Sequence, residues 1–268
     1  MKVRNRVFVL TGGGNGIGRA LALNLISNGA RIAAVDIDQD GLDETVERAG
    51  ANRSRLSTHV VDITDRAAVA DLPEHIASTH GAVDGLINNA GIIQPFVRVN
   101  DLDYDAIERV MNVNFYGTLY MTKEFLPHLL KRPEAHIANV SSMGGFLPVP
   151  GQTVYGASKA AVKLFTEGLY SELMDTSVGV TLVLPGAIGT DIAAHSGVTP
   201  TSADGEGRAS MKPLEVGKAA QIIVGAIEKE RYRVRVGRDS TLMDVIYRIS
   251  PKFAAKFIFK QMKSLLPG

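Results

Sequence analysis

Short runs of apolar residues, each of strand length, recur along the chain and are separated by longer segments with helical spacing of apolar positions. Strands that are apolar at nearly every position and alternate with helices form a parallel sheet covered on both faces. Right-handed crossovers then give a doubly wound, three-layer α/β/α fold of about seven strands. The expected strands are Val7–Leu10, Arg31–Val35, Leu56–Val61, Gly85–Ile87, His136–Val140 and Val178–Leu184, with Val234–Val236 as a candidate seventh.

Length and composition fit one large α/β domain. The chain has 268 residues, of which 45% are hydrophobic and 21% charged, as in ordinary globular proteins. We expect a single domain over residues 1–268, with a polar, glycine-containing substrate loop at about 187–212 and an amphipathic helical extension at about 239–266.

Charge and targeting signals narrow the function classes. The net charge of +1 gives no field that would attract nucleic acid. No apolar run reaches the length of a membrane span, no signal-peptide pattern follows Met1, and there is no cysteine. We therefore expect a cytoplasmic protein without disulfides or thiolate metal sites.

The first strand runs into a glycine-rich turn with the spacing Gly12-x-x-x-Gly16-x-Gly18, and a helix is expected over Ile17–Ile26. Glycine lets the backbone turn sharply and approach a pyrophosphate, and the helix N-terminus offers free N–H groups to phosphate. The alternative is a tight strand-to-helix turn that binds nothing. The spacing differs from G-x-G-x-x-G, so the residues around the turn must decide between the two interpretations.

Asp36 ends the second strand and lies 18 residues after Gly18. A carboxylate there can accept hydrogen bonds from both hydroxyls of the adenosine ribose, and it would repel a 2′-phosphate. The sequence therefore predicts binding of NAD rather than NADP. Asp38 is the alternative acid for the ribose, but we expect it to cap the following helix. Arg19 could attract a phosphate, but we expect it to lie on the outer face of the first helix.

Further motifs follow the glycine turn in order: Asp62-Ile63, Asn88-Asn89-Ala90-Gly91, Asn114, Ser142, Tyr155-x-x-x-Lys159 and Pro185-Gly186. Over about residues 5–235 the chain thus resembles the short-chain dehydrogenase/reductase family, which implies a Rossmann-like fold and an oxidoreductase. The resemblance implies a cofactor site made by Gly12, Gly14, Asn15, Gly16, Ile17, Gly18, Asp36, Asp62, Ile63, Asn89, Ala90, Gly91, Tyr155, Lys159, Pro185, Gly186, Ile188 and Thr190.

Tyr155 and Lys159 are four positions apart, so a helix places them on one face. A free tyrosine has a pKa near ~10, and a neighbouring ammonium group and a positive nicotinamide ring would lower it. We expect Tyr155 to act as the acid/base, and Lys159 to tune it and to bind the nicotinamide ribose. Taken singly, each residue could be an ordinary helix position, but the combination of motifs favours catalysis.

Two further residues complete the expected catalytic set of Asn114, Ser142, Tyr155 and Lys159. Ser142 follows a strand, where a hydroxyl points into the ligand crevice and can orient the substrate oxygen. Family spacing selects Ser142 over Ser141, which is expected to be structural. By resemblance, the backbone of Asn114 holds a water molecule joined to Lys159, which gives a proton path to solvent.

The substrate site is expected to contain Ser142, Tyr155, Gln94, Phe146 and Gln152. The walls expected around them are Ile93–Pro95, Gly144–Pro148, Gln152 and the loop Ile192–Met211, which are mainly apolar with a few amides. We therefore expect an uncharged, fairly hydrophobic secondary alcohol or ketone as the small-molecule partner. The same site could instead serve a 3-oxoacyl-thioester reductase that uses NADPH, although Asp36 argues against NADPH. A non-catalytic NAD-sensing protein is a third possibility, which the retained tyrosine and lysine disfavour.

Two other chemistries lack their sequence signatures. The six histidines are scattered without paired spacing, so no metal site is expected. Neither Ser141 nor Ser142 lies in a G-x-S-x-G nucleophile elbow, which excludes that type of hydrolase.

The C-terminal stretch from Pro251 to Leu266 places lysines on one helical stripe and covers the rest with apolar side chains. It could touch an anionic membrane or pack on protein, and we favour packing because amphipathic helices usually cover cores. The family resemblance implies a homodimer or homotetramer through the helices around Asn112–Leu130 and Tyr155–Met174. The lysines of the stripe are Lys252, Lys256, Lys260 and Lys263.

Overall fold

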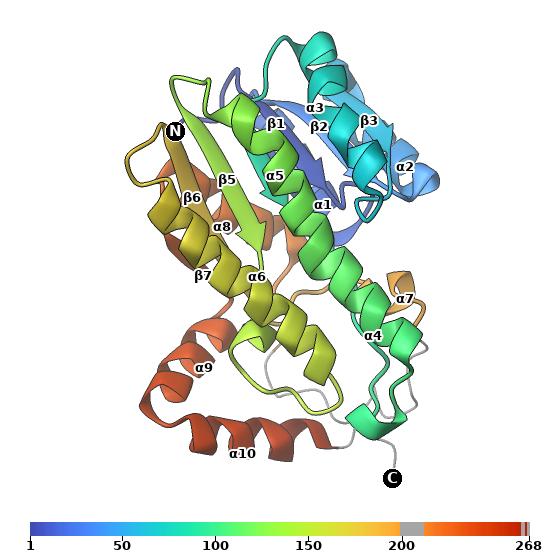
Figure 1. Ribbon diagram of the computed structural model, residues 1–268, viewed down its shortest axis with the longest axis vertical. Coiled ribbons are helices and arrows are strands. Elements are labelled where there is room, and N and C mark those ends of the chain that lie inside the picture. Colours follow the sequence, from blue (N-terminus) through green and yellow to red (C-terminus); the bar gives the residue numbers. More distant parts are fainter. Residues whose placement is uncertain (199–211, 264–265, 267–268) are drawn as a thin grey trace.

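The computed structural model describes residues 1–198, 212–263 and 266. Seven strands, all paired in parallel, form one sheet in the order β3-β2-β1-β4-β5-β6-β7 (Figure 1). The predicted doubly wound sheet is confirmed, and the candidate seventh strand is part of it. The strands are β1 Val7–Thr11, β2 Arg31–Asp36, β3 Leu56–Val60, β4 Gly85–Asn88, β5 Ala135–Val140, β6 Val178–Pro185 and β7 Arg233–Val236.

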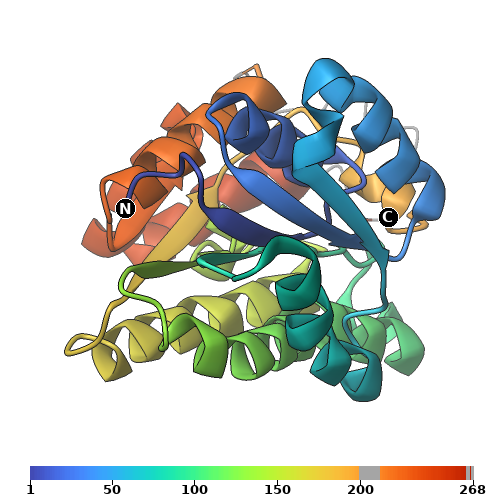
Figure 2. The ribbon, with the colours of Figure 1, turned by 90° about the horizontal axis from the view of Figure 1, so that it is seen from above.

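Helices cover both faces of the sheet, which lies between them in Figure 2. One layer consists of α1 (Gly16–Ser27), α2 (Gln39–Ala49) and α8 (Val216–Glu228), and the other of α3 (Arg66–His80), α5 (Thr118–Leu129) and α6 (Thr153–Glu172). Each layer buries the apolar side of its helices against the strands, in two separate clusters. The remaining helices are α4 Tyr104–Met111, α7 Ile192–His195, α9 Arg238–Ile249 and α10 Pro251–Met262.

The strand order reverses between β1 and β4, because the chain winds outward to β3 on one side and to β7 on the other. At such a reversal the loops leaving the two carboxyl ends part in opposite directions and open a crevice. The crevice lies beyond Thr11 and Asn88, where the glycine turn and the Asn89-Ala90-Gly91 segment begin.

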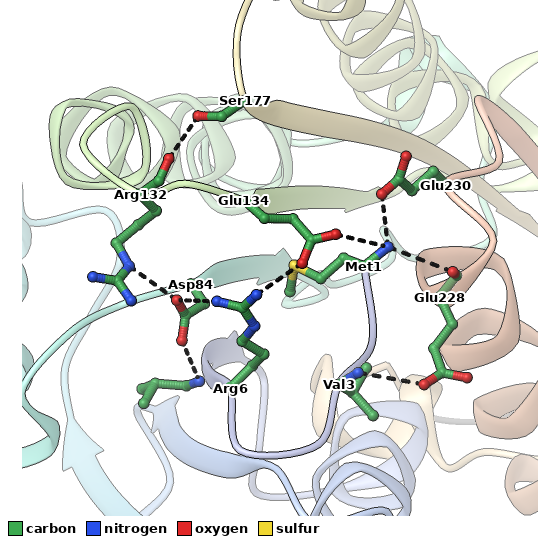
Figure 3. A network of polar contacts seen from close by, with 10 residues as sticks. Met1, Val3, Arg6, Asp84, Arg132, Glu134, Ser177, Glu228 and Glu230 are labelled. Carbon is green, nitrogen blue, oxygen red and sulfur yellow. Dashed lines mark hydrogen bonds and ion pairs between the residues drawn. The ribbon is translucent and has the colours of Figure 1, made fainter.

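The amino ends of the strands carry a polar network that holds the opposite edge of the sheet (Figure 3). The Asp84 carboxylate is almost fully buried, accepts a hydrogen bond from Val7 N at 2.9 Å, and pairs with Arg6 at 3.3 Å and Arg132 at 2.9 Å. Two cations and a backbone donor thus compensate its burial, as a buried charge requires. These contacts stabilise the amino ends of the strands. A functional site is therefore expected at the opposite, carboxyl ends.

The C-terminal extension forms the two helices α9 and α10. Met243 of α9 and Ala254 and Ile258 of α10 are buried together with Leu147 and neighbouring residues that follow β5. The extension therefore packs on its own domain, which was the favoured expectation. In the part of the chain that the structure describes, no helix is both long and apolar enough to cross a membrane.

His136 lies inside β5 with only 1% of its surface exposed. Its Nε2 is 2.8 Å from Thr181 Oγ1, and because that hydroxyl donates to Arg231 O, it must accept from Nε2–H. Nδ1 is then unprotonated, and it faces Gly179 on the neighbouring strand, where an added Cβ would lie 2.6 Å away. Burial lowers the pKa of His136 from 6.5 to about 4.

We expect acid to destabilise the fold through His136. Between pH 6.5 and about 4 the unfolded chain binds a proton that the folded chain refuses, so stability falls as the pH drops through this range. The loss attributable to His136 is at most about 3.5 kcal/mol, at ~1.4 kcal/mol per pKa unit. Urea unfolding across this range should show a shallower loss for His136→Gln than for the wild type. Equal slopes for the two proteins would contradict this origin.

Candidate active site

A cleft of about 980 Å³ follows the carboxyl ends of the strands. The predicted site residues that line it fall into two groups, one at the carboxyl ends of β1, β2, β3 and β4 and the other around β5, β6 and α6. The first group contains Gly12, Asn15, Gly16, Ile17, Asp36, Asp62, Ile63, Asn89, Ala90 and Gly91, and the second Ser142, Tyr155, Lys159, Pro185, Gly186, Ile188 and Thr190.

The glycine turn brings bare backbone to the cleft. Gly12 and Gly16 have φ values of +69° and +48°, a region that side chains other than glycine rarely adopt. Gly18 is turned inward, where an added Cβ would run into the carbonyl oxygen of Gly12. The first turn of α1 has no side-chain cap, since Asn15 accepts nothing from it. Its N–H groups therefore remain free for an anion in the cleft.

Asp36 is held at the end of β2 by two backbone donors. Its Oδ2 accepts from Gly14 N at 2.8 Å and its Oδ1 from Asp38 N at 3.1 Å. The carboxylate is partly exposed and lines the cleft. Gly14 therefore supports Asp36 instead of lining the cleft. Asp38 caps α2 by accepting from Gly41 N at 3.1 Å, as predicted.

Arg19 differs from its expectation. Its guanidinium group donates to Gly14 O and to Thr45 Oγ1, and pairs with Glu44 of α2 at 2.7 Å. With a side chain only 15% exposed, Arg19 lies between α1 and α2 and does not face solvent. It thereby holds the glycine turn in place from the side that faces α2. The outer-face prediction was wrong because helical spacing alone does not reveal the acceptors that α2 provides.

The Asn88–Gly91 segment ties the central strands together. Asn88 Nδ2 donates to Asn139 Oδ1 at 2.8 Å, which joins β4 to β5 inside the protein. The N–H groups of Asn89 and Ala90 both donate to Thr11 Oγ1, at 3.0 and 3.1 Å. These bonds hold the wall of the cleft at the reversal of the strand order.

Tyr155, Ser142 and Lys159 come together where α6 meets the end of β5. Tyr155 is partly exposed toward the cleft and shares a side-chain hydrogen bond with Ser142. Ser142 also accepts from Gly144 N at 3.0 Å, which fixes its rotamer. Lys159 is 4% exposed, and its Nζ donates to Val140 O at 3.1 Å.

The electrostatics of this group depart from the expectation. Enclosure by protein raises the pKa of Tyr155, and the hydrogen bond with Ser142 opposes that rise. Burial lowers the pKa of Lys159 from 10.5 to about 8, so the ammonium form is itself held at a cost. The expected lowering of the tyrosine pKa by Lys159 is therefore not seen in the protein alone, where burial raises that pKa and the hydrogen bond with Ser142 lowers it.

Asn114 lies in a π-helical segment, Asn112–Gly117, between α4 and α5. It is fully buried, and its amide bridges both backbone groups of Ile92 and the hydroxyl of Ser158. The backbone carbonyl oxygen of Asn114 accepts from Thr118 Oγ1 at 2.9 Å. Asn114 thus sits behind the cleft wall, and local widening of a helix of this kind often marks a functional site.

Three side chains expected in the substrate site do not line the cleft. Gln94 is fully buried, and its Oε1 accepts from Val154 N at 2.8 Å and Tyr155 N at 2.9 Å. It therefore caps the first turn of α6 and sets the position of Tyr155, a role that the sequence does not reveal. Gln152 is also buried and donates to Gln94 O at 2.7 Å, and Phe146 packs against Tyr247 of α9.

The described start of the predicted substrate loop is fastened to the rest of the site. Ser196 Oγ accepts from Ile93 N at 3.0 Å, and Arg109 of α4 donates to Ser196 O at 2.9 Å. His195 is exposed and lines the mouth of the cleft. Residues 199–211, the rest of that loop prediction, lie outside the described residues.

Asp239 at the start of α9 supports the loop after β6. Its Oδ2 accepts from Ala187 N at 2.6 Å, and the neighbouring Ser240 donates to Leu184 O at 2.9 Å. Both Gly186 and Gly237 lie so close to the Asp239 carboxylate that neither has room for a side chain. The C-terminal extension therefore contacts the cleft lining directly, which the sequence did not indicate.

Three of the histidines thought to be scattered lie together at the edge of the sheet. Ser57 Oγ is 2.9 Å from His59 Nε2 and 2.8 Å from His80 Nε2, and the rings of His59 and His75 are 5.4 Å apart. Burial lowers the pKa of His59 to about 4. Among the described residues, no group of three or more side chains is arranged to hold a metal ion.

Known proteins share this fold and much of this sequence. A family model described as short chain dehydrogenase matches residues 6–200. SadH from Mycobacterium tuberculosis is 39% identical over 256 residues, which are 91% of this chain and 90% of SadH.

Two solved structures are similar over nearly their whole length. A short chain dehydrogenase/reductase from Burkholderia phymatum, in complex with NAD, has a TM-score of 0.84 at 26% identity, covering 94% of this chain and 96% of that one. A short chain dehydrogenase from Burkholderia cenocepacia, in complex with NADP, has a TM-score of 0.79 at 27% identity, covering 96% and 99%. Proteins with this fold bind either NAD or NADP, so the preference for one dinucleotide must depend on individual residues of the site.

Proposed function

The chain belongs to the short-chain dehydrogenase family and is an oxidoreductase, and we propose that it transfers a hydride between NAD(H) and an uncharged, fairly hydrophobic secondary alcohol or ketone. The observation that carries the proposal is a single cleft with an uncapped helix N-terminus and Asp36 at one end, and Tyr155, Ser142 and Lys159 at the other. The first end suits a dinucleotide and the second suits proton transfer.

The residues present fit a nicotinamide dinucleotide. The free N–H groups of the first turn of α1 suit a pyrophosphate, and the Asp36 carboxylate suits the adenosine ribose. An added Cβ at Gly16 would come within 3.4 Å of Thr190 Cγ2, so a side chain there would narrow the space between the turn and the β6 loop. Asp62 and Ile63 would border the adenine, and Pro185, Gly186 and Ile188 the nicotinamide end.

Hydride transfer to or from the substrate carbon is the chemistry that the bound nicotinamide supplies. Ser142 donates a hydrogen bond to the substrate oxygen and holds it beside the Tyr155 hydroxyl. In reduction, Tyr155 gives its proton to that oxygen, and in oxidation it takes the proton from the alcohol. The alcohol thus loses a hydride and a proton in forming the carbonyl, and the reverse direction restores both.

Lys159 has two roles in this proposal. Its ammonium group stabilises the phenolate that Tyr155 forms when it gives up a proton. It also binds the ribose next to the nicotinamide. An added Cβ at Gly91 would lie 2.8 Å from Lys159 Nζ and 3.1 Å from Asn114 Oδ1, so Gly91 leaves room for the cation beside Asn114. We propose that the proton returns to solvent from Lys159 through a water molecule held by the backbone of Asn114.

The test is an activity screen over uncharged secondary alcohols with NAD and the matching ketones with NADH, followed through NADH absorbance. Turnover with at least one apolar substrate is expected, together with a rise in thermal stability on adding NAD. Tight NAD binding without turnover over the whole screen would favour a non-catalytic sensor. Turnover of 3-oxoacyl thioesters with NADPH alone would favour the thioester reductase instead.

Asp239→Ala should weaken dinucleotide binding without touching the proton-transfer group. The substitution removes the acceptor for Ala187 N, so the loop that borders the nicotinamide end loses its support. A hydrogen bond to a charged group is worth ~1.5–3 kcal/mol, so we expect KM for NAD to rise by roughly tenfold or more, with a smaller change in kcat. Thr241→Ala, at an exposed position two residues further along α9, is the control. An unchanged KM would show that the loop holds its shape unaided.

We also propose that the protein is a homo-oligomer through the exposed faces of α5 and α6. Leu164 on α6 is 69% exposed, and Tyr116 in the π-helical segment that leads into α5 is 41% exposed, so each helix presents an apolar side chain to a partner. Sedimentation equilibrium should give a dimer or tetramer mass, and Leu164→Glu should lower it. A monomer mass for the wild-type protein would contradict this assembly.

A further inference from the structure

The outward side of α10 combines lysines with exposed phenylalanines. The helix faces its own domain through Ala254 and Ile258, which are 0% and 6% exposed. Phe253 and Phe259 are 58% and 50% exposed, and Phe257 is 38% exposed. At 100° per residue, these rings lie on both sides of the lysine stripe. The stripe is therefore bordered by apolar side chains and not by the acidic residues common on the exposed face of a helix.

The charge of this segment has one sign. No acidic side chain follows Asp244 in the sequence, whereas five basic residues do. The first of them, Arg248, pairs with Asp244, but the lysines of α10 are all exposed. On the preceding helix, Leu242, Val245 and Ile249 form an exposed apolar stripe with i, i+3, i+7 spacing, and Ile249 is 80% exposed at the turn into α10.

We propose that α10 docks this protein on an anionic lipid surface. Each lysine near such a surface contributes attraction to anionic headgroups, while phenylalanine side chains gain by entering the headgroup boundary. The long lysine stems let the ammonium groups stay in the polar layer while the neighbouring rings go deeper. This inference does not depend on the proposed hydride transfer.

Charge complementarity favours lipid over a second copy of the chain. Two copies meeting through this face would bring two lysine stripes together without an acidic residue of the segment between them. An acidic protein would satisfy the lysines, but it would leave aromatic rings on both flanks to find apolar partners. A bilayer surface offers negative charge and an apolar layer over the whole width of the helix.

Vesicle co-sedimentation of the full chain tests the proposal. We expect binding to phosphatidylcholine vesicles that contain phosphatidylglycerol, little binding to pure phosphatidylcholine, and release at high salt. Lys256→Gln combined with Lys260→Gln should lower the partition coefficient by roughly 30-fold, and Phe253→Ser combined with Phe257→Ser by about tenfold or more.

Controls come from exposed positions elsewhere on the molecule. Lys123→Gln combined with Lys229→Gln, and Tyr104→Ser at an 82% exposed ring, should leave vesicle binding unchanged. Circular dichroism and thermal unfolding will identify any variant that fails to fold, and the salt and lipid dependence of the wild type does not rely on variants. No binding to anionic vesicles would overturn the proposal. A solution mass that falls in Phe253→Ser/Phe257→Ser, without vesicle binding by the wild type, would assign the face to a second copy and also overturn it.

Discussion

Tyr155→Phe should abolish turnover while leaving NAD binding nearly intact. The substitution keeps the ring, which packs at the first turn of α6 beside Gly144, and removes only the hydroxyl that bonds to Ser142. Positioned acid–base groups contribute ~10²–10⁴-fold, so kcat is expected to fall by at least about 10³-fold. Binding of NAD, measured by calorimetry, should change by no more than about threefold, because the loss concerns the transition state alone.

Tyr170→Phe is the matched control for this prediction. Tyr170 lies on the same helix and packs against Tyr232 at a ring distance of 4.5 Å, outside the cleft. The control should retain wild-type kcat and NAD affinity. Substantial turnover in Tyr155→Phe would remove the tyrosine from the chemistry, whichever substrate was used.

Asp36→Ala should relax the preference for NAD over NADP. The carboxylate is fixed toward the cleft by the N–H groups of Gly14 and Asp38, so it cannot turn away from a 2′-phosphate, which would be repelled. We expect the wild type to use NADH with a kcat/KM roughly 100-fold above that for NADPH, equivalent to ~2.8 kcal/mol. The variant should lose about tenfold with NADH and gain with NADPH.

Asp38→Ala provides the control, because Asp38 lines the same cleft but its carboxylate caps α2 by accepting from Gly41 N. Losing a cap costs ~1 kcal/mol of stability, so its unfolding temperature should drop while its preference for NADH is retained. A clear NADPH preference in the wild type would refute the cofactor assignment and favour the thioester reductase alternative.

Much of the fold follows from local patterns. Each of the seven strands lies where the sequence predicted one, although the edge strands β3 and β7 are not continuous apolar runs. The alternation with helices was enough to predict a parallel sheet. The glycine turn and the Asp38 cap were likewise predictable, because both depend on residues close together in the chain.

The parts that could not be predicted depend on contacts between distant residues. Gln94 caps a helix that begins about 60 residues later, and Arg19 is held by acceptors on α2. An amide or a guanidinium group fits many environments, so its residue type does not disclose its partner. The pKa of Tyr155 could not be predicted for a similar reason. The spacing places Lys159 one helical turn away, but it does not reveal that burial raises the pKa of the tyrosine and lowers that of the lysine.

The most direct test of the account is a crystal structure of the protein with NAD and a slowly reacting ketone. The account predicts that the nicotinamide C4 and the Tyr155 hydroxyl will face the same carbonyl group, with Ser142 Oγ bonded to its oxygen and Lys159 Nζ to the adjacent ribose. A tyrosine hydroxyl directed away from the nicotinamide, with the carbonyl oxygen held by other groups, would contradict it.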